Sequence, residues 1–270
     1  MKNDHFSSLN HRHELFEKLK NNNPIWWQFV KENINPEGFY VDIRKDNSLN
    51  VYYNGGSLLK VMLSHGEIKG KIHEHYLGKT GSKYVDFKLN SLPENAKKIM
   101  KRIKSKYDNK SESGIKARLI CSPKARYIDS EFAYQTTRID LTKLENSKIV
   151  FVELKRIEDG RLLTNEYENG KPEILSQMEE YQKFTKDYNQ KITKYYKTLF
   201  EIKRDLQILP QSLAGINNID DYELSENIEL YIEPYPNLNS EQIPSLSPRQ
   251  IRRIEAIKMI LNQNNIVHNL

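Results

Sequence analysis

The spacing of apolar residues predicts helices in four parts of the chain. In residues 11–33, apolar side chains recur every three or four positions, with a break expected at 21–24. Residues 93–107 repeat this spacing, and so does a long segment from about Pro172 to Pro210. Ser247 followed by Pro248 is a typical helix start, so a last helix is expected from there.

Alternation of apolar and polar residues predicts strands between these helices. Residues 38–88 alternate in about five short runs, with a hairpin signal at Asn54-Gly55-Gly56, which is typical of an antiparallel meander. Further strands are expected at 115–121, 126–135, 136–144, 147–157 and 227–233. From residue 93 onward, the order of helix, strands, long helix and strand predicts an α/β unit with a mixed sheet.

The expected fold class is therefore α/β, or α+β overall, in two parts. With 270 residues the chain is long enough for about two domains. Residues 1–90 are expected to form a module of an N-terminal helix and a β-meander. Residues 91–270 are expected to form a second domain, in which helices flank a central mixed sheet and a helix follows at the C-terminal end.

The composition indicates the cellular compartment and excludes some kinds of functional site. Cys121 is the only cysteine, which excludes an internal disulfide and any site that needs several cysteines. No apolar run approaches about 20 residues, and the N-terminus lacks the pattern of a signal peptide. A cytoplasmic protein without a membrane partner is expected.

Basic residues are concentrated in one region of the chain. The sequence has 42 basic and 36 acidic residues, and residues 93–126 carry eleven of the basic and three of the acidic ones. Such a concentration suits a polyanion such as nucleic acid, although an ordinary solvated lysine-rich helix is the alternative. Tyr52 and Tyr53, beside the hairpin glycines, are expected to be exposed and to offer a stacking surface for bases.

Three charged residues on two adjoining predicted strands are the strongest sign of chemistry. Glu153 and Lys155 stand two positions apart at the end of an apolar run, so their side chains project from the same face of the strand. Asp140 lies one strand earlier, and a hairpin would bring both carboxylates to one point. Two carboxylates beside a lysine suit Mg²⁺-dependent phosphodiester hydrolysis, in which the cation activates water and neutralises phosphate charge. For Glu153 and Lys155 alone, a cross-strand salt bridge is the alternative.

The chain resembles the PD-(D/E)xK nuclease superfamily, and more closely its RecB-type branch. The residues that carry the resemblance are Asp140, Glu153-Leu154-Lys155 and, on the following helix, Gln177 with Tyr181 in the QxxxY spacing. Ile139 stands where the motif has its proline. The resemblance covers about residues 93–235 and implies a restriction-endonuclease-like core.

The resemblance implies a Mg²⁺-dependent deoxyribonuclease, with Mn²⁺ expected to substitute for Mg²⁺. The expected metal ligands are Asp140, Glu153, the Leu154 carbonyl and, as an additional acid, Glu131, and Lys155 is the expected catalytic lysine. Gln177 and Tyr181 share a helix face and would bind substrate or orient a ligand. Tyr181 also fits the apolar core of its own helix, and the sequence supports both roles equally.

The expected partner is DNA, with RNA as an alternative, in defence, restriction or repair. Lys97, Lys101, Arg102 and Lys104 are candidates for contacts with backbone phosphates, which position a duplex without reading its sequence. A homodimer or a larger complex is left open. The alternative function, from a different class, is a catalytically inactive nucleic-acid-binding or scaffold protein with the same fold.

Overall fold

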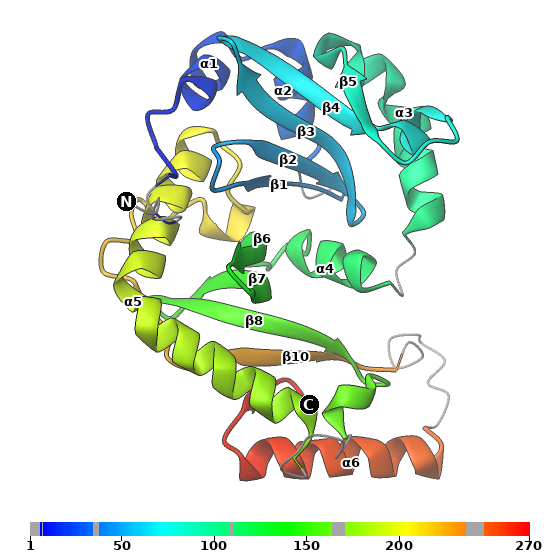
Figure 1. Ribbon diagram of the computed structural model, residues 1–270, viewed down its shortest axis with the longest axis vertical. Coiled ribbons are helices and arrows are strands. Elements are labelled where there is room, and N and C mark those ends of the chain that lie inside the picture. The colour runs from blue at the N-terminus through cyan, green and yellow to red at the C-terminus, as the bar shows by residue number, and fades with distance from the viewer. Residues whose placement is uncertain (1–5, 7, 35–37, 108–110, 164–170, 236–245) are drawn as a thin grey trace.

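The computed structural model describes residues 6, 8–34, 38–107, 111–163, 171–235 and 246–270. In these residues the chain is an α+β protein with an antiparallel five-stranded sheet, a mixed six-stranded sheet and six α-helices (Figure 1). The five-stranded sheet lies in the upper half of Figure 1 and the six-stranded sheet in the lower half, with helix α4 between them. The α+β class and the mixed sheet that the sequence predicts are both present.

The five-stranded sheet is the predicted antiparallel meander, with its strands in chain order. They are β1 (Phe39–Ile43), β2 (Leu49–Tyr53), β3 (Gly56–Ser64), β4 (Glu67–His73) and β5 (Tyr84–Phe87). Three helices pack on the apolar face of this sheet: α1 (Glu14–Asn22), α2 (Ile25–Glu32) and α3 (Leu92–Lys106). Helix α3 approaches so closely that a Cβ at Gly56 would lie 2.5 Å from the Ile103 side chain. A division at residue 90 would therefore separate α3 from the sheet on which it packs.

The six-stranded sheet combines an antiparallel half with a parallel half. Its order is β11-β10-β8-β7-β6, and β9 pairs with β8 beside this path. Strands β6, β7 and β8 are antiparallel neighbours, whereas β9 and β10 run parallel to β8, and β11 runs parallel to β10. The strands are β6 (Tyr127–Tyr134), β7 (Thr137–Glu145), β8 (Lys148–Arg156), β9 (Glu223–Leu224), β10 (Glu229–Glu233) and β11 (Val267–His268). Strand β8 is thus central, and every residue between its two ends is buried.

The two faces of β8 meet different neighbours. Ile149 and Phe151 belong to the large core that includes helix α5 (Glu173–Asp205). Val150 and Val152 belong to a smaller cluster with helix α4 (Glu112–Ile120) and with Tyr40 and Tyr52 of the five-stranded sheet. Side chains of successive strand residues point to opposite faces, so any charged side chain on β8 is placed against one of these two layers.

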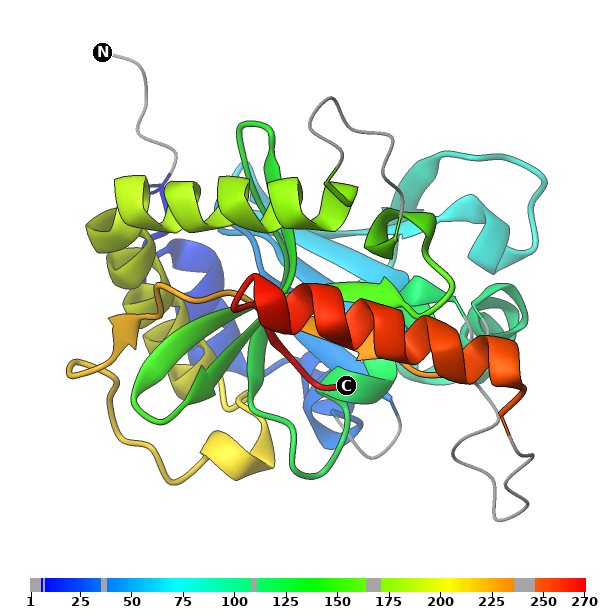
Figure 2. The same ribbon diagram turned by 90° about the horizontal axis from the view of Figure 1, so that it is seen from below.

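The long helix α5 lies along one side of β8, and helix α6 (Pro248–Gln263) lies beneath the same sheet (Figures 1 and 2). Arg253 of α6 donates hydrogen bonds to the carbonyls of Ile157 and Asp159, just after β8. Among the described ranges of the chain, no helix has both the length and the apolar character that crossing a membrane would require.

The strand predicted at 115–121 is wrong, because residues 115–120 lie in helix α4 and Cys121 is its C-cap. Ile115, Ala117 and Leu119 alternate with Lys116 and Arg118 and so imitate a strand. The Ser111 hydroxyl, however, accepts a hydrogen bond from the Gly114 amide and caps a helix that begins at Glu112. The cap signal was present in the sequence, and the alternation concealed it.

Buried charged groups join the two sheets. The Asp42 carboxylate of β1 accepts a 2.5 Å hydrogen bond from the Ser130 hydroxyl of β6 and one of 3.3 Å from Arg44. It also lies 3.5 Å from the Lys203 ammonium of α5. Buried charges are tolerated in proteins only when they are paired and hydrogen-bonded, so these contacts hold the sheets in one relative position.

Candidate functional site

The hairpin of β7 and β8 opens at the residues that the sequence singles out. The ladder between the two strands ends with the pair Leu141 and Val152, so Asp140 and Glu153 are the first residues beyond it. Asp140 Oδ2 accepts a 2.9 Å hydrogen bond from the Leu154 amide. The predicted hairpin is therefore confirmed, and it brings Asp140 next to the Glu153–Lys155 segment.

The backbone is irregular at this point. Ile139 belongs to the core on the α5 side, whereas Leu141 belongs to the cluster on the α4 side. In a regular strand these two side chains would share a face, so the alternation of β7 breaks at Asp140. On β6, between the residues that pair with Ile139 and Leu141, Glu131 has a φ of +56°, in the left-handed region that few non-glycine residues adopt. Such backbone outliers cluster at functional sites.

Glu153 and Lys155 are buried side by side on the α5 face of β8. Each residue is 4% exposed, and the Lys155 ammonium donates a hydrogen bond to Glu153 Oε1. Gln177 Nε2 of α5 donates to the same carboxylate oxygen over 2.9 Å. The predicted shared face of Glu153 and Lys155 is present, and it points at the helix that follows the strand.

Gln177 and Tyr181 extend this network along α5. Gln177 Nε2 lies 2.7 Å from the Tyr181 hydroxyl, which in turn donates a 2.5 Å hydrogen bond to the Arg138 carbonyl of β7. The Tyr181 ring is buried in the core. The predicted place of Tyr181 in the core is therefore confirmed, and its hydroxyl also joins the network; its role toward a substrate or ligand stays a prediction. Gln177 Oε1 is buried and has no hydrogen-bond partner among the described residues.

The Glu153 carboxyl has an unusual pKa. Burial, and after it the nearby Asp140 carboxylate, raise the pKa of Glu153 to about 7, although Lys155 acts to lower it. Glu153 is thus near the midpoint of its titration at neutral pH. Any additional positive charge placed between Glu153 and Asp140 would stabilise the ionised form of the Glu153 carboxyl.

Lys116 of α4 is a member of the site that sequence reasoning missed. Its ammonium lies 3.4 Å from Asp140 Oδ1 and 3.4 Å from Glu131 Oε1, so it sits between the two acids. Burial acts to lower the pKa of Lys116, but Asp140, Glu131 and Glu112 outweigh it and raise the pKa. The signal was the spacing of Glu112 and Lys116 by four residues, which indicates a helix face and was hidden by the incorrect strand prediction.

The four basic residues predicted to contact phosphates belong to helix α3, which packs on the five-stranded sheet. Lys97, Lys101 and Lys104 are exposed there. Arg102 instead donates a hydrogen bond to the Tyr76 carbonyl over 3.0 Å, which gives it a structural role. None of these four side chains has a contact with the residues around Glu153 among the hydrogen bonds and ion pairs that the described residues form.

A second basic surface lies closer to the acids. Lys60 of β3 and Lys71 of β4 are direct cross-strand partners. Their two positive charges repel each other unless an anion lies nearby. Both line a hollow of about 520 Å³ that Glu131 also lines.

The prediction that Tyr52 is exposed is wrong. Tyr52 is only 7% exposed, and its ring stacks on that of Tyr40 with the two ring centroids 4.8 Å apart.

The donor set suits a cation that needs few protein ligands. The described residues contain no group of three His, Cys, Asp or Glu side chains placed to hold a metal. Asp140 and Glu153 supply two carboxylates, and the Leu154 carbonyl leaves β8 on the same side as the amide that reaches Asp140. Mg²⁺ typically binds through one or two carboxylates and keeps several waters. Glu131 is held by Lys116, which separates it from this set.

Comparison with protein-family models, with curated proteins and with solved structures found no match for this chain. Its function is therefore argued from the site itself: two carboxylates, two buried lysines and a glutamine, brought together from α4, β7, β8 and α5.

The Glu153 carboxyl should titrate with a midpoint near 7, because burial and the Asp140 carboxylate raise its pKa to about 7. In the unfolded chain its pKa is ordinary, so between that value and 7 the folded state binds more protons, and this contribution to stability falls as the pH rises. We expect Asp140→Asn to lower the midpoint, because it removes a like charge, and Lys155→Met to raise it.

Side-chain ¹³C NMR of labelled glutamate measures this midpoint, and the signal that disappears in Glu153→Gln identifies the residue. A midpoint at the ordinary value for glutamate, about 4.3, would show that the carboxyl is not held as described.

Proposed function

We propose that this protein is a metal-dependent nuclease that hydrolyses phosphodiester bonds in DNA, with a PD-(D/E)xK-type site on a restriction-endonuclease-like core. One observation carries the proposal: Asp140, Glu153, Lys155 and Gln177, which the motif selects from three separate segments, meet where the β7–β8 hairpin opens. If these residues only formed ordinary salt bridges, there would be no need to bury the Glu153 carboxyl and to bind it with both Lys155 and Gln177.

Each residue has a distinct task in this proposal. Asp140 and Glu153 would hold Mg²⁺, which when bound neutralises phosphate charge and lowers the pKa of a coordinated water. The Lys155 ammonium, already beside Glu153, orients the attacking water and stabilises developing negative charge. Gln177 fixes the rotamer of Glu153 by its 2.9 Å hydrogen bond, and partners of this kind tune metal ligands.

The proposed substrate is a nucleic acid because positive charge surrounds the acids. Lys116 adjoins Asp140, and the hollow with Lys60 and Lys71 leads to Glu131 beside it. Lysines at such positions bind backbone phosphates without regard to sequence. DNA is the proposed form, with RNA as the alternative, and the exposed lysines of α3 would extend the contact.

A specific observation supports a second candidate, a nucleic-acid-binding or scaffold protein without catalysis. The Lys155 ammonium is bound to Glu153, and Lys116 lies at Asp140 Oδ1, so both acids already have an intramolecular cation. A protein that had lost catalysis would be stable in this state. The two candidate functions differ in the role of Asp140 and Glu153. In the nuclease these acids also bind a metal ion for cleavage, whereas in the scaffold protein they only form the intramolecular ion pairs.

The purified chain should nick or linearise plasmid DNA with Mg²⁺ or Mn²⁺ and be inactive in EDTA. Glu153→Gln, Asp140→Asn and Lys155→Met should each lower the cleavage rate at least about 100-fold, because the first two remove a charge that would hold the cation and the third removes the ammonium that acts on the attacking water. Gel analysis of circular and linear DNA measures the rate and separates endonuclease from exonuclease action.

The matched controls are Glu158→Gln and Lys148→Met, which remove exposed charges just after and at the start of β8. Both should cleave at the wild-type rate. If Glu153→Gln cleaved as fast as Glu158→Gln, the proposed active site would be wrong, and binding of DNA without cleavage by the wild-type chain would favour the scaffold candidate.

Gln177→Ala should lower cleavage about 10- to 100-fold, the range seen when a ligand-orienting partner is removed. The loss of stability should be only about 1 kcal/mol, the usual contribution of one hydrogen bond. Tyr181→Phe keeps the packed ring and removes the hydroxyl, so it should lower cleavage with a similarly small change in melting temperature.

Gln190→Ala, an exposed position on the same helix, serves as the control for helix propensity. Comparison of cleavage rates with thermal unfolding distinguishes the two roles of Gln177. A large drop in melting temperature with normal cleavage would make Gln177 a structural residue and remove the QxxxY element from the site.

A further inference from the structure

The outer face of the five-stranded sheet, opposite the helices α1, α2 and α3, is covered at one end and open at the other. Asp42 of β1 is 2% exposed, because β6 lies against it, whereas Tyr84 of β5 is 47% exposed. Lys60 pairs with Lys71, and two positions further along β4 His73 pairs with Tyr84. Side chains two positions apart on a strand share a face, so Lys60, Lys71 and Tyr84 lie together on the open part.

The hollow of about 520 Å³ lies over this open part of the face. Lys60, Lys71 and Tyr84 line it, and Ser57 adds a hydroxyl from β3. Among the described residues, neither lysine forms a hydrogen bond or an ion pair. Two ammonium groups that face each other without a partner are arranged to bind an anion, because an anion would relieve their repulsion.

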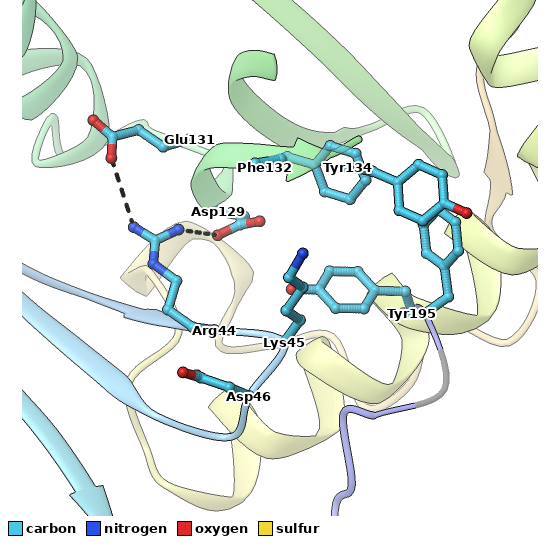
Figure 3. Close-up of a pocket in the computed structure, with 10 residues that line it drawn as sticks. Arg44, Lys45, Asp46, Asp129, Glu131, Phe132, Tyr134 and Tyr195 are labelled. Carbon is cyan, nitrogen blue, oxygen red and sulfur yellow. Dashed lines mark ion pairs between the residues drawn. The ribbon is translucent and has the colours of Figure 1, made fainter. Parts of the chain in front are cut away.

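The charge around the hollow also favours an anion. Glu131 is the only acid among the described residues that line it, and two cations neutralise this acid. Its carboxylate lies 3.4 Å from the Lys116 ammonium and 3.9 Å from the Arg44 guanidinium, the second contact being visible in Figure 3. Asp86 lies opposite Lys71 on β5, but the two form no ion pair within the described part of the chain. The two lysines therefore leave the hollow with excess positive charge.

The Tyr84 ring supplies a stacking surface at the edge of the hollow. It makes an edge-to-face contact with His73, with the ring centroids 5.5 Å apart, and remains nearly half exposed. Exposed aromatic rings next to basic side chains stack the bases of single strands. The bases of a duplex are already paired and stacked on one another, so they offer no free face to such a ring.

The size and position of the hollow fit one strand that leads to the acids. Pockets of about 300–1,000 Å³ hold ligands of small-molecule size, so a hollow of about 520 Å³ accommodates single nucleotide units rather than both strands of a duplex. At its far side Glu131 contacts Lys116, which in turn contacts Asp140. A strand that lies over Lys60 and Lys71 is thereby directed toward the proposed metal site.

We propose that this face binds an unpaired strand of nucleic acid, with Lys60 and Lys71 at its backbone phosphates and the Tyr84 ring stacked on one of its bases. Such a strand is the substrate of the proposed nuclease, so this assignment rests on the proposed function and narrows it to a single strand or the unpaired part of a duplex. Negative supercoiling favours the opening of a duplex, so nicking of a supercoiled plasmid stays an expected result.

Fluorescence anisotropy in EDTA measures this binding without any cleavage. A labelled strand of about 16 nucleotides should bind at least about tenfold more tightly than the same strand in a blunt duplex. Tyr84→Ala should weaken binding of the strand about tenfold or more, the effect of losing one stacked base. Tyr84→Phe keeps the ring and should bind the strand within about twofold of the wild type.

The double variant Lys60→Met with Lys71→Met tests the phosphate contacts. The slope of log affinity against log salt should fall by about 1.4, because each contact with a phosphate of a single strand contributes about 0.7. The matched control is Lys183→Met with Lys186→Met, two exposed lysines of α5, which should leave the slope unchanged.

The proposal would be overturned if the duplex bound as tightly as the strand, if Tyr84→Ala bound the strand normally, or if the slope were unchanged without Lys60 and Lys71. None of these results would bear on cleavage, so the proposed hydrolysis would still stand on its own test. Strand binding of the expected kind without any cleavage in Mg²⁺ would support this face as a binding site and contradict the hydrolysis alone.

Discussion

The burial of the Glu153 carboxylate is the constraint on which the rest of the site depends. A carboxylate in a protein interior is costly unless other groups supply charge and hydrogen bonds, and here Lys155 and Gln177 supply both. Asp140 raises the cost by adding a like charge beside it. The surrounding fold therefore maintains two acids in close proximity where an apolar pair would be more stable, and the cation of the proposed function would give that arrangement a use.

The five-stranded sheet is connected to this site by charge as well as by packing. Asp42 of β1 and Arg44, just after β1, reach Ser130 and Asp129 of β6, and the next residue of β6, Glu131, leads to Lys116 and Asp140. A ligand that moved β1 relative to β6 would move Glu131 as well. The N-terminal module is thus linked to the two acids through Glu131 and Lys116, which its sequence alone did not reveal.

The elements with strong periodicity could be predicted from the sequence, and the shape of the site could not. The meander of residues 38–88, the hairpin of β7 and β8 and the helix α5 follow from alternation and helical spacing, and they are sufficient to bring Asp140, Glu153, Lys155 and Gln177 together. Lys116 was missed because Ile115, Ala117 and Leu119 alternate like a strand. The left-handed backbone at Glu131 and the burial of Tyr52 depend on tertiary contacts, which no local pattern encodes.

The central claim is that Asp140 and Glu153 together form a cation site, and a Mn²⁺ titration followed by electron paramagnetic resonance tests it most directly. The signal of free Mn²⁺ should fall as the wild-type chain binds the ion, and this binding should be lost in both Asp140→Asn and Glu153→Gln but kept in Glu158→Gln. Binding should also strengthen as the pH rises toward 7, because the protonated Glu153 carboxyl must lose its proton to accept the ion. Absence of Mn²⁺ binding, or binding that is unchanged in Glu153→Gln, would contradict the account.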